Sequence, residues 1–371
     1  MPDKTLFLTL RTFSATGGIE KVSRVAGMAL RELACEQGGD SLKVLSMYDD
    51  SGDVDEKYFP AAIFDGFGEN KLQFVYEALR QGTGCKQVIL SHANLLLPGF
   101  LIKLLSPKTK LVLLAHGIEV WSPFPFLKKR MLAKCDQVIA VSAFTKARMI
   151  SVHQVAEDKI TVLNNCLDPF LQLPLENQRS PVLSKRYGLT IDNLVLITLT
   201  RLSSSEQYKG YDNVFFAVKE LKAQFPQIKY LVVGKSDELE QARVAQLVKE
   251  LGLEQQVIFT GFIPDDELAA HYCIADLYIM PSKKEGFGIV FIEAMYYGKP
   301  VIAGNKDGSV DALDNGRLGL LINPDDQQEI AAAIVKVFND KNAYLPKRRE
   351  VLAKFGYPVY KEHLREILDK V

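Results

Sequence analysis

The most informative segment of the 371-residue sequence is 277–295, which reads LYIMPSKKEGFGIVFIEAM. Leu277 to Met280 is a short apolar run typical of a buried strand, and an apolar helical pattern begins at Ile289. A glycine-flanked turn joins the two. A strand followed directly by a helix is typical of a β-α-β unit with a parallel sheet.

The same alternation continues on both sides of this segment. The chain is too long for one compact core, and the strands fall into two series, which predicts two α/β domains. The first series comprises Leu6–Leu10, Leu42–Met47, Gln87–Ser91, Lys110–Ala115 and Gln137–Val141, and the second comprises Leu194–Thr200, Lys229–Val233, Gln256–Thr260, Leu277–Met280, Pro300–Ile302 and Gly319–Ile322.

A polar stretch between Leu171 and Tyr187 separates the two series. We therefore predict two Rossmann-like, doubly wound domains, residues 1–176 and 177–356, that face a cleft. A last helix, 357–371, should cross back to the first domain. Doubly wound sheets bind ligands at the carboxyl ends of their strands, where the strand order reverses, so the site should lie there.

Composition excludes several classes of protein. The 45 basic residues balance the 45 acidic ones, so no overall field attracts nucleic acid, and none is expected as a partner. The five cysteines are widely spaced and lack zinc-site spacing, so they are interpreted as small buried side chains in a reducing compartment. The start of the sequence lacks a signal-peptide pattern and no run is long enough to span a membrane, so the expected location is the cytoplasm.

Two segments of the second domain carry charges suited to a phosphorylated ligand. In the segment 284–295, backbone N–H groups at a helix start would bind an anion, while Glu285 and Glu293 would bind hydroxyl groups. Arg201 follows the first strand of this domain and Lys209 precedes the next helix, so both could neutralise a diphosphate. The alternative is a capped helix with solvated charges.

In the first domain, Gly17 and Gly18 follow the first strand and precede a helix that should start near Lys21. Glycine lets a phosphate or an acceptor approach the backbone closely, although a plain turn would also use it. His116 ends an aliphatic strand, which indicates either a ligand contact or a satisfied structural histidine.

Asp53-Val54-Asp55 has the spacing of a metal-binding D-x-D motif. It lies in an acidic loop with Asp49, Asp50 and Glu56, and we interpret that loop as a solvated turn. No metal is therefore expected.

Residues 100–150 are strongly basic, with nine Lys or Arg against two acidic residues. Within them Trp121, Phe124 and Phe126 look exposed beside the cations of 128–130. Apolar anchors next to cations suit an anionic membrane surface, whereas a solvated basic helix over core aromatics is the alternative.

Together these motifs resemble the retaining glycosyltransferases of family 4, which have the GT-B fold. Glu285 and Glu293 are similar to that family's E-x7-E motif, and Arg201 and Lys209 to its diphosphate-binding pair. Supporting segments are Gly17–Glu20, His116–Glu119, Val141–Lys146 and Thr260–Pro264, whereas Asn164-Asn165-Cys166 departs from the family's asparagine-glycine pair.

The resemblance implies roles for individual residues. Arg201, Lys209, His116 and Glu285 would be catalytic. The substrate-binding residues would be Gly17, Gly18, Phe262, Ile263, Gly286, Phe287, Gly288 and Glu293, with Glu293 on the ribose and Phe262 and Ile263 framing the base.

The implied reaction transfers a sugar with retention from a nucleoside diphosphate to a saccharide or lipid-linked acceptor, without a cofactor. UDP-glucose is the expected donor, and GDP-mannose is the alternative. A lipid-linked acceptor favours contact between residues 100–150 and the inner face of the plasma membrane. A GT-B phosphorylase, a sugar-nucleotide epimerase and a catalytically silent polysaccharide- or membrane-binding homologue are the competing interpretations.

Overall fold

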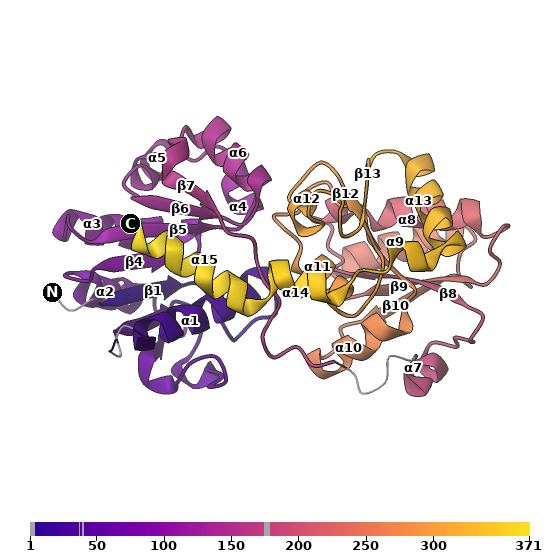
Figure 1. The fold of residues 1–371 in the computed structure, drawn as a ribbon, viewed down its shortest axis with the longest axis horizontal. Helices are drawn as coiled ribbons and strands as arrows, with labels where there is room; N and C mark the ends of the chain where they lie inside the picture. The colour runs from indigo at the N-terminus through magenta and orange to yellow at the C-terminus, as the bar shows by residue number, and fades with distance from the viewer. Residues whose placement is uncertain (1–3, 37, 39–40, 174–178) are drawn as a thin grey trace. The chain divides into compact units, whose positions relative to one another are not determined.

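The computed structural model describes residues 4–36, 38, 41–173 and 179–371, which divide into two compact units (Figure 1). Unit 1 comprises Met1–Pro169 and Phe355–Val371, and unit 2 comprises Phe170–Lys354. The expected boundary at residues 176 and 177 falls outside the described residues. Unit 2 is thus one continuous segment, whereas unit 1 is assembled from both ends of the sequence.

Unit 1 contains a seven-stranded sheet in the order β3-β2-β1-β4-β5-β6-β7, and all its strand pairs are parallel. Its strands are β1 (Thr5–Thr9), β2 (Leu42–Ser46), β3 (Phe64–Gly66), β4 (Gln87–Leu90), β5 (Lys110–Ala115), β6 (Gln137–Ala140) and β7 (Ile160–Val162). Its helices are α1 (Gly18–Glu36), α2 (Lys71–Gly82), α3 (Leu96–Leu105), α4 (Ile118–Trp121), α5 (Phe126–Leu132), α6 (Ala143–His153) and α15 (Tyr357–Asp369), with 3-10 turns η1 (Ser51–Asp53), η2 (Ala61–Ile63), η3 (Ala93–Leu95) and η4 (Glu157–Lys159).

Side chains of the central strand of unit 1 alternate between two cores. Leu6 and Leu8 pack with residues of α2, α3, α5 and α6, whereas Phe7 packs with residues of α1 and α15. This period of two is expected for a strand that is buried on both faces. Helix α15 therefore completes one face of the unit 1 sheet, where it lies against α1 (Figure 1).

Unit 2 contains a six-stranded parallel sheet in the order β10-β9-β8-β11-β12-β13. Its strands are β8 (Leu194–Leu199), β9 (Ile228–Val233), β10 (Val257–Gly261), β11 (Leu277–Met280), β12 (Val301–Gly304) and β13 (Leu320–Ile322). Its helices are α7 (Pro181–Arg186), α8 (Tyr211–Leu221), α9 (Glu238–Glu250), α10 (Asp265–Ile274), α11 (Ile289–Tyr296), α12 (Ser309–Ala312) and α13 (Gln327–Asn339), with η5 (Gln207–Lys209) and η6 (Lys341–Tyr344); α14 (Arg348–Phe355) runs to the boundary.

The two sheets share one topology. In each, the strand order reverses between the first strand and its later neighbour, at β1 and β4 in unit 1 and at β8 and β11 in unit 2. The prediction of two doubly wound α/β domains is confirmed, and the loops after these four strands are the expected ligand-binding positions.

Some local expectations were wrong. The edge strands β3 and β7, of three residues each, were not predicted. Helix α1 begins at Gly18 rather than near Lys21, so Gly18 belongs to the helix. Cys35 is exposed, unlike the other four cysteines. Within the described parts of the chain, no helix combines the length and the apolar character that crossing a membrane requires.

Candidate functional site

In unit 2, the structure brings two of the predicted site residues into direct contact at the reversal of strand order. Lys209 lies in η5, on the connection after β8, and Glu285 lies on the loop after β11. The Lys209 ammonium donates to the Glu285 carboxylate at 2.6 Å. Burial opposes the ammonium charge, but the neighbouring Glu285 carboxylate outweighs it and raises the pKa of Lys209. The pair therefore holds a fixed positive and a fixed negative charge.

Arg201, the second residue of the connection after β8, points to solvent. Its side chain is 69% exposed and donates to Glu206 at 2.6 Å. A guanidinium has five N–H donors, so this contact leaves capacity for a further anion.

Tyr208 was missed by sequence reasoning. Its ring lies 5.7 Å from the Lys209 ammonium and 5.8 Å from that of Lys284, and burial raises the pKa of its hydroxyl. The only signal in the sequence was an aromatic residue directly before Lys209. Tyr208 thus places a polarisable ring beside the ammonium groups of Lys209 and Lys284.

The glycine turn before α11 has the expected form. Gly288 caps the helix with φ +87°, a conformation that favours glycine. Phe287 is buried. Within the described residues, the amides of Gly286 and Gly288 make no hydrogen bond to a protein acceptor. A helix start with such amides can accept an anion.

Glycines elsewhere let this turn lie against its neighbours. A Cβ on Gly210, which has φ +81°, would lie 2.2 Å from the carbonyl oxygen of Pro281, and one on Gly304 would lie 2.1 Å from that of Ser282. The loop after β11 is therefore held between the connections that follow β8 and β12. This close backbone packing brings Lys209 to Glu285.

Asp307 also escaped prediction. It is buried between β12 and α12, and its carboxylate accepts the backbone N–H of Glu285 at 2.6 Å and that of Ser309 at 2.9 Å. Burial raises the pKa of Asp307 to about 6, and the Glu285 charge adds to this effect. In the sequence it was one acid among several in a polar segment.

The remaining predicted residues of unit 2 lie around this centre. Glu293 is on α11, is only 1% exposed and accepts the Tyr272 hydroxyl at 3.0 Å. Phe262 is exposed and Ile263 half-buried on the loop after β10, which is two strands away from β8.

In unit 1 the loop after β1 is organised by Asp49. This buried carboxylate accepts the backbone N–H groups of Thr12, Phe13 and Ser14 at 2.6, 3.3 and 2.8 Å. The hydroxyls of Ser14 and Ser46 donate to it at 2.5 and 2.6 Å. The interpretation of the acidic loop as solvated was wrong at Asp49, because five donors compensate its burial.

Gly17 and Gly18 follow this organised loop. A Cβ on Gly17 would lie 2.3 Å from the Glu20 carboxylate, whereas Gly18 has open space in front of it. Neither glycine has a positive φ. Gly18 is therefore the position at which a ligand could approach the backbone.

His116 follows β5 and is buried. Its Nε2 lies 2.7 Å from the carbonyl oxygen of Ser91, and its backbone N–H donates to Glu119 at 2.6 Å. His92, which follows β4, was not predicted; its Nδ1 accepts the N–H of Asn94 at 3.0 Å, and burial lowers its pKa to about 4. A neutral His92 therefore carries its proton on Nε2, which can donate to a ligand.

Asp53 and Asp55 have local partners. Asp53 accepts the backbone N–H of Asp50 at 2.8 Å, and Asp55 pairs with Lys57 at 2.9 Å. In the described residues, no group of three or more His, Cys, Asp or Glu side chains is arranged to hold a metal ion.

Within residues 100–150 the aromatic side chains differ. Trp121 was expected to be exposed but is buried, because its ring packs on Phe144 and its N–H donates to Thr145 at 3.3 Å. Phe126 and Leu127, at the start of α5, are 76% and 60% exposed. Within 121–127 the exposed large hydrophobic side chains are therefore Phe126 and Leu127.

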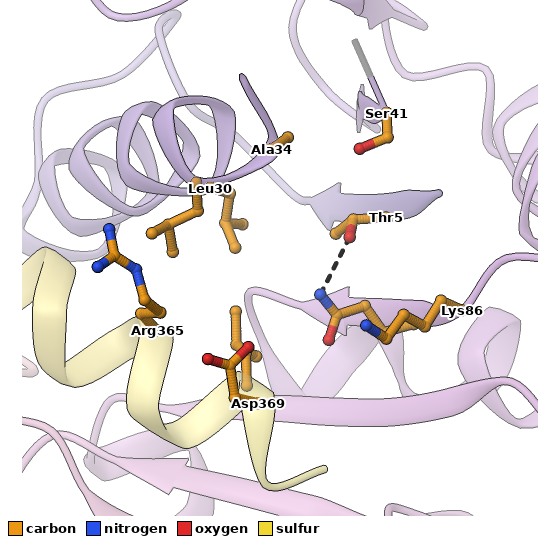
Figure 2. A pocket seen from close by; sticks show the side chains of 10 residues that line it. Thr5, Leu30, Ala34, Ser41, Lys86, Arg365 and Asp369 are labelled. Carbon is orange, nitrogen blue, oxygen red and sulfur yellow. Dashed lines mark hydrogen bonds between the residues drawn. The ribbon is translucent and has the colours of Figure 1, made fainter. Parts of the chain in front are cut away.

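A small pocket of unit 1 lies elsewhere, at the amino-terminal ends of β1 and β4, between α1 and α15 (Figure 2). Gln87 donates to Thr5 at 3.0 Å across it, the bond drawn dashed in Figure 2. It is at the opposite end of the strands from the predicted site. We assign no function to it.

Profiles of two protein families match the sequence. The family described as "Glycosyl transferases group 1" matches residues 185–357, and "Glycosyltransferase Family 4" matches residues 58–169. Together they cover about three quarters of the chain.

Two curated relatives are mannosyl-transfer enzymes by name. The chain is 31% identical over 242 residues to a GDP-mannose-dependent alpha-(1-6)-phosphatidylinositol monomannoside mannosyltransferase of Mycolicibacterium smegmatis, covering 62% of this chain and 61% of the relative. It is 30% identical over 216 residues to mannosylfructose-phosphate synthase of Agrobacterium fabrum, covering 57% and 46%. The matched region thus spans less than two thirds of either relative.

Solved structures resemble the chain over its whole length. HepE of Anabaena, crystallised with UDP, has a TM-score of 0.80 at 22% identity, covering 99% of this chain and 100% of that one. Sucrose-phosphate synthase of Thermosynechococcus elongatus has a TM-score of 0.76 at 21% identity, covering 99% and 98%. At this identity the likeness shows the fold, which is GT-B.

Proposed function

Because the chain belongs to the group 1, family 4 glycosyltransferases, we propose that it moves a sugar, with retention, from a nucleoside diphosphate donor to a hydroxyl of a saccharide or lipid-linked acceptor. The Lys209–Glu285 pair beside the glycine turn of α11 is the observation that carries the proposal. It places an ammonium, a carboxylate and a helix start together. These three groups can bind the phosphates and hydroxyls of a sugar diphosphate.

The positive groups would stabilise the departing diphosphate. Lys209 gives one bond to Glu285 and Arg201 one to Glu206, and both keep donor capacity for phosphate oxygens. The amides of Gly286 and Gly288 and the dipole of α11 add to this charge stabilisation. No step in this scheme requires a metal or another cofactor.

Retention follows if the acceptor hydroxyl attacks the face that the diphosphate leaves. The leaving phosphate would take the hydroxyl proton, and Glu285 would hold sugar hydroxyls through its second carboxylate oxygen. Glu293 would bind the ribose, since a carboxylate accepts hydroxyl hydrogen bonds such as the one from Tyr272. Phe262 and Ile263 would frame the base, and Gly17, Gly18 and His116 would bind the acceptor and the transferred sugar.

GDP-mannose is the first donor to test, because the Mycolicibacterium smegmatis relative depends on it by name. UDP-glucose, expected from the family resemblance, is the alternative. Both donors share the diphosphate and the ribose, so the groups described above would serve either.

The test is incubation of the protein with each donor and a panel of saccharide and lipid-linked acceptors. Retention predicts a product whose anomeric configuration, read by NMR, equals that of the donor. Phosphate-dependent release of a sugar phosphate would indicate a phosphorylase instead, and a changed sugar nucleotide without transfer would indicate an epimerase. A protein that binds sugar nucleotides but turns over none would be a silent homologue.

The exposed apolar surface of α3 and α5 supports a peripheral membrane contact. Phe126 and Leu127 on α5 and Leu104 and Leu105 on α3 are exposed, and the two helices are in contact. Cations next to them would attract an anionic lipid surface: Lys108, Lys129, Arg130 and Lys134. We propose that the protein acts in the cytoplasm and contacts the inner face of the plasma membrane through this surface.

Vesicle flotation tests this contact. The wild-type chain should float with vesicles that contain phosphatidylglycerol and less with pure phosphatidylcholine. A Phe126→Ser, Leu127→Ser double variant should lose most of this binding. Leu72→Ser removes an exposed leucine on α2, away from this surface, and is the control. Equal flotation of all three proteins would contradict the proposal.

A further inference from the structure

The backbone of Glu285 is held from both sides by the segment that precedes α12. The Asp307 carboxylate accepts the N–H of Glu285 at 2.6 Å, and the N–H of Gly308 donates to the carbonyl oxygen of Glu285 at 2.8 Å. The second Asp307 oxygen accepts the N–H of Ser309 at 2.9 Å. Two hydrogen bonds thus connect the loop after β11 to the loop after β12, and the third fixes Asp307 on its own segment.

This connection requires an unusually close approach of the two backbones. A Cβ on Gly308 would lie 2.0 Å from the carbonyl oxygen of Gly286 and 2.8 Å from that of Glu285. Any side chain at position 308 would therefore push the two loops apart. Only a glycine permits the contact.

Asp307 is an unfavourable choice for a purely structural link. Its side chain is 2% exposed, and it lies close enough to the charged Glu285 for that carboxylate to oppose its ionisation. A carboxylate nevertheless suits the geometry, because each of its oxygens accepts one N–H. An asparagine would turn an N–H₂ group toward one of these two donors.

We propose that Asp307 is a positioning residue for sugar transfer, which fixes the backbone of Glu285 so that its carboxylate stays on Lys209 and toward the donor sugar. The inference rests on the proposed function. Asp307 itself touches no substrate and acts through Glu285.

Asp307→Asn is the principal test. Hydrolysis of GDP-mannose and of UDP-glucose is monitored without acceptor, through the amount of GDP or UDP released. Binding of GDP and UDP is measured separately by calorimetry. Turnover should fall about tenfold to a hundredfold, whereas nucleotide affinity should change less than about threefold, because Lys209 and Arg201 are unaltered. Asp276→Asn is the matched control, since Asp276 is also a largely buried carboxylate that accepts a backbone N–H, that of Val195 at 2.9 Å.

A double-mutant cycle distinguishes positioning from general damage. If Asp307 acts through Glu285, the Glu285→Gln, Asp307→Asn double variant should be no slower than Glu285→Gln alone. Additive losses, or wild-type turnover of Asp307→Asn, would overturn the inference while leaving the proposed function intact. A wild-type protein that binds neither nucleotide and cleaves neither donor would overturn both.

Amide hydrogen exchange of the wild-type protein provides a second test, which does not depend on whether Asp307→Asn folds. The Glu285 N–H should exchange at least about a hundredfold more slowly than that of Gly286, because only the former has a buried acceptor. Equal exchange of the two amides would show that the link to Asp307 is not maintained in solution.

Discussion

Each unit holds a buried aspartate that accepts backbone N–H groups from a loop after one of its strands, but the two aspartates are compensated differently. Asp49 in unit 1 receives five hydrogen bonds, three from backbone N–H groups and two from serine hydroxyls. Asp307 in unit 2 receives the N–H groups of Glu285 and Ser309 and lies beside a second carboxylate.

The difference indicates two roles. Asp49 is a structural anchor, whereas Asp307 is a positioning residue. Donors surround Asp49, and the loop after β1 is fixed around it. Burial and the Glu285 charge act against the ionised form of Asp307. Loss of Asp49 should therefore affect stability, and loss of Asp307 should affect turnover.

The largest effect is expected for Asp49→Ala, which leaves buried donors without an acceptor. It should lower the free energy of unfolding of unit 1 by about 3–5 kcal/mol. The single tryptophan, Trp121, is buried in unit 1, so its fluorescence during urea unfolding reports this unit alone. Asp55→Ala, which removes an exposed ion pair, should cost less than about 1 kcal/mol. Equal losses in the two variants would contradict the anchor role.

The next largest effect is expected when one of the positive charges that would stabilise the leaving diphosphate is removed. Lys209→Ala and Arg201→Ala should each lower kcat about a hundredfold or more while the fold is retained, because each removes charge stabilisation of the leaving group. Lys222→Ala, which removes an exposed cation of unit 2 that bonds to Gly252, is the control. Wild-type turnover in both site variants would refute the diphosphate assignment.

A smaller effect follows from the titration of Asp307, whose pKa burial raises to about 6. Turnover should fall about tenfold from pH 7.5 to pH 5, because the protonated carboxyl cannot accept both N–H groups. The charged groups that face it are Glu285, which pairs with Lys209, and on its own segment Lys306, which pairs with Asp325.

The stability contribution of Asp307 should have the opposite sign. A carboxyl whose folded pKa lies above its unfolded value, about 3.9, stabilises the fold when protonated. This contribution is complete below pH 4 and is lost as the pH rises through 6. Asp307→Asn should remove the pH dependence of turnover, measured as a kcat profile, and that of stability, measured by urea unfolding. If kcat of this variant still falls at acid pH as in the wild type, Asp307 is not the source of that fall.

The smallest expected effect is that of chelation. Activity in excess EDTA should stay within about twofold of the untreated enzyme, because cations and a helix start serve the leaving group. A complete loss of activity that Mg²⁺ restores would instead favour a metal site at Asp53 and Asp55.

Sequence patterns predicted the sheets well, because buried parallel strands are near-continuous apolar runs. They also indicated that Lys209 and Glu285 follow strands of the same sheet, and the structure shows that these strands, β8 and β11, are neighbours at the reversal of strand order. The roles of Asp49 and Asp307 could not be predicted. Their donors come from loops far away in sequence, Ser14 for one and Glu285 for the other, and an aspartate in a polar loop ordinarily indicates a solvated turn.

Helix α15 has a consequence for the order in which the chain folds on the ribosome. Tyr360, Leu364 and Ile367 belong to the core of unit 1, on the face shared with α1. Domains commonly fold as they are synthesised, the amino-terminal one first. Here all of Phe170–Lys354 must be translated before unit 1 receives its last helix. The unit whose synthesis starts first is therefore the one that completes its core last.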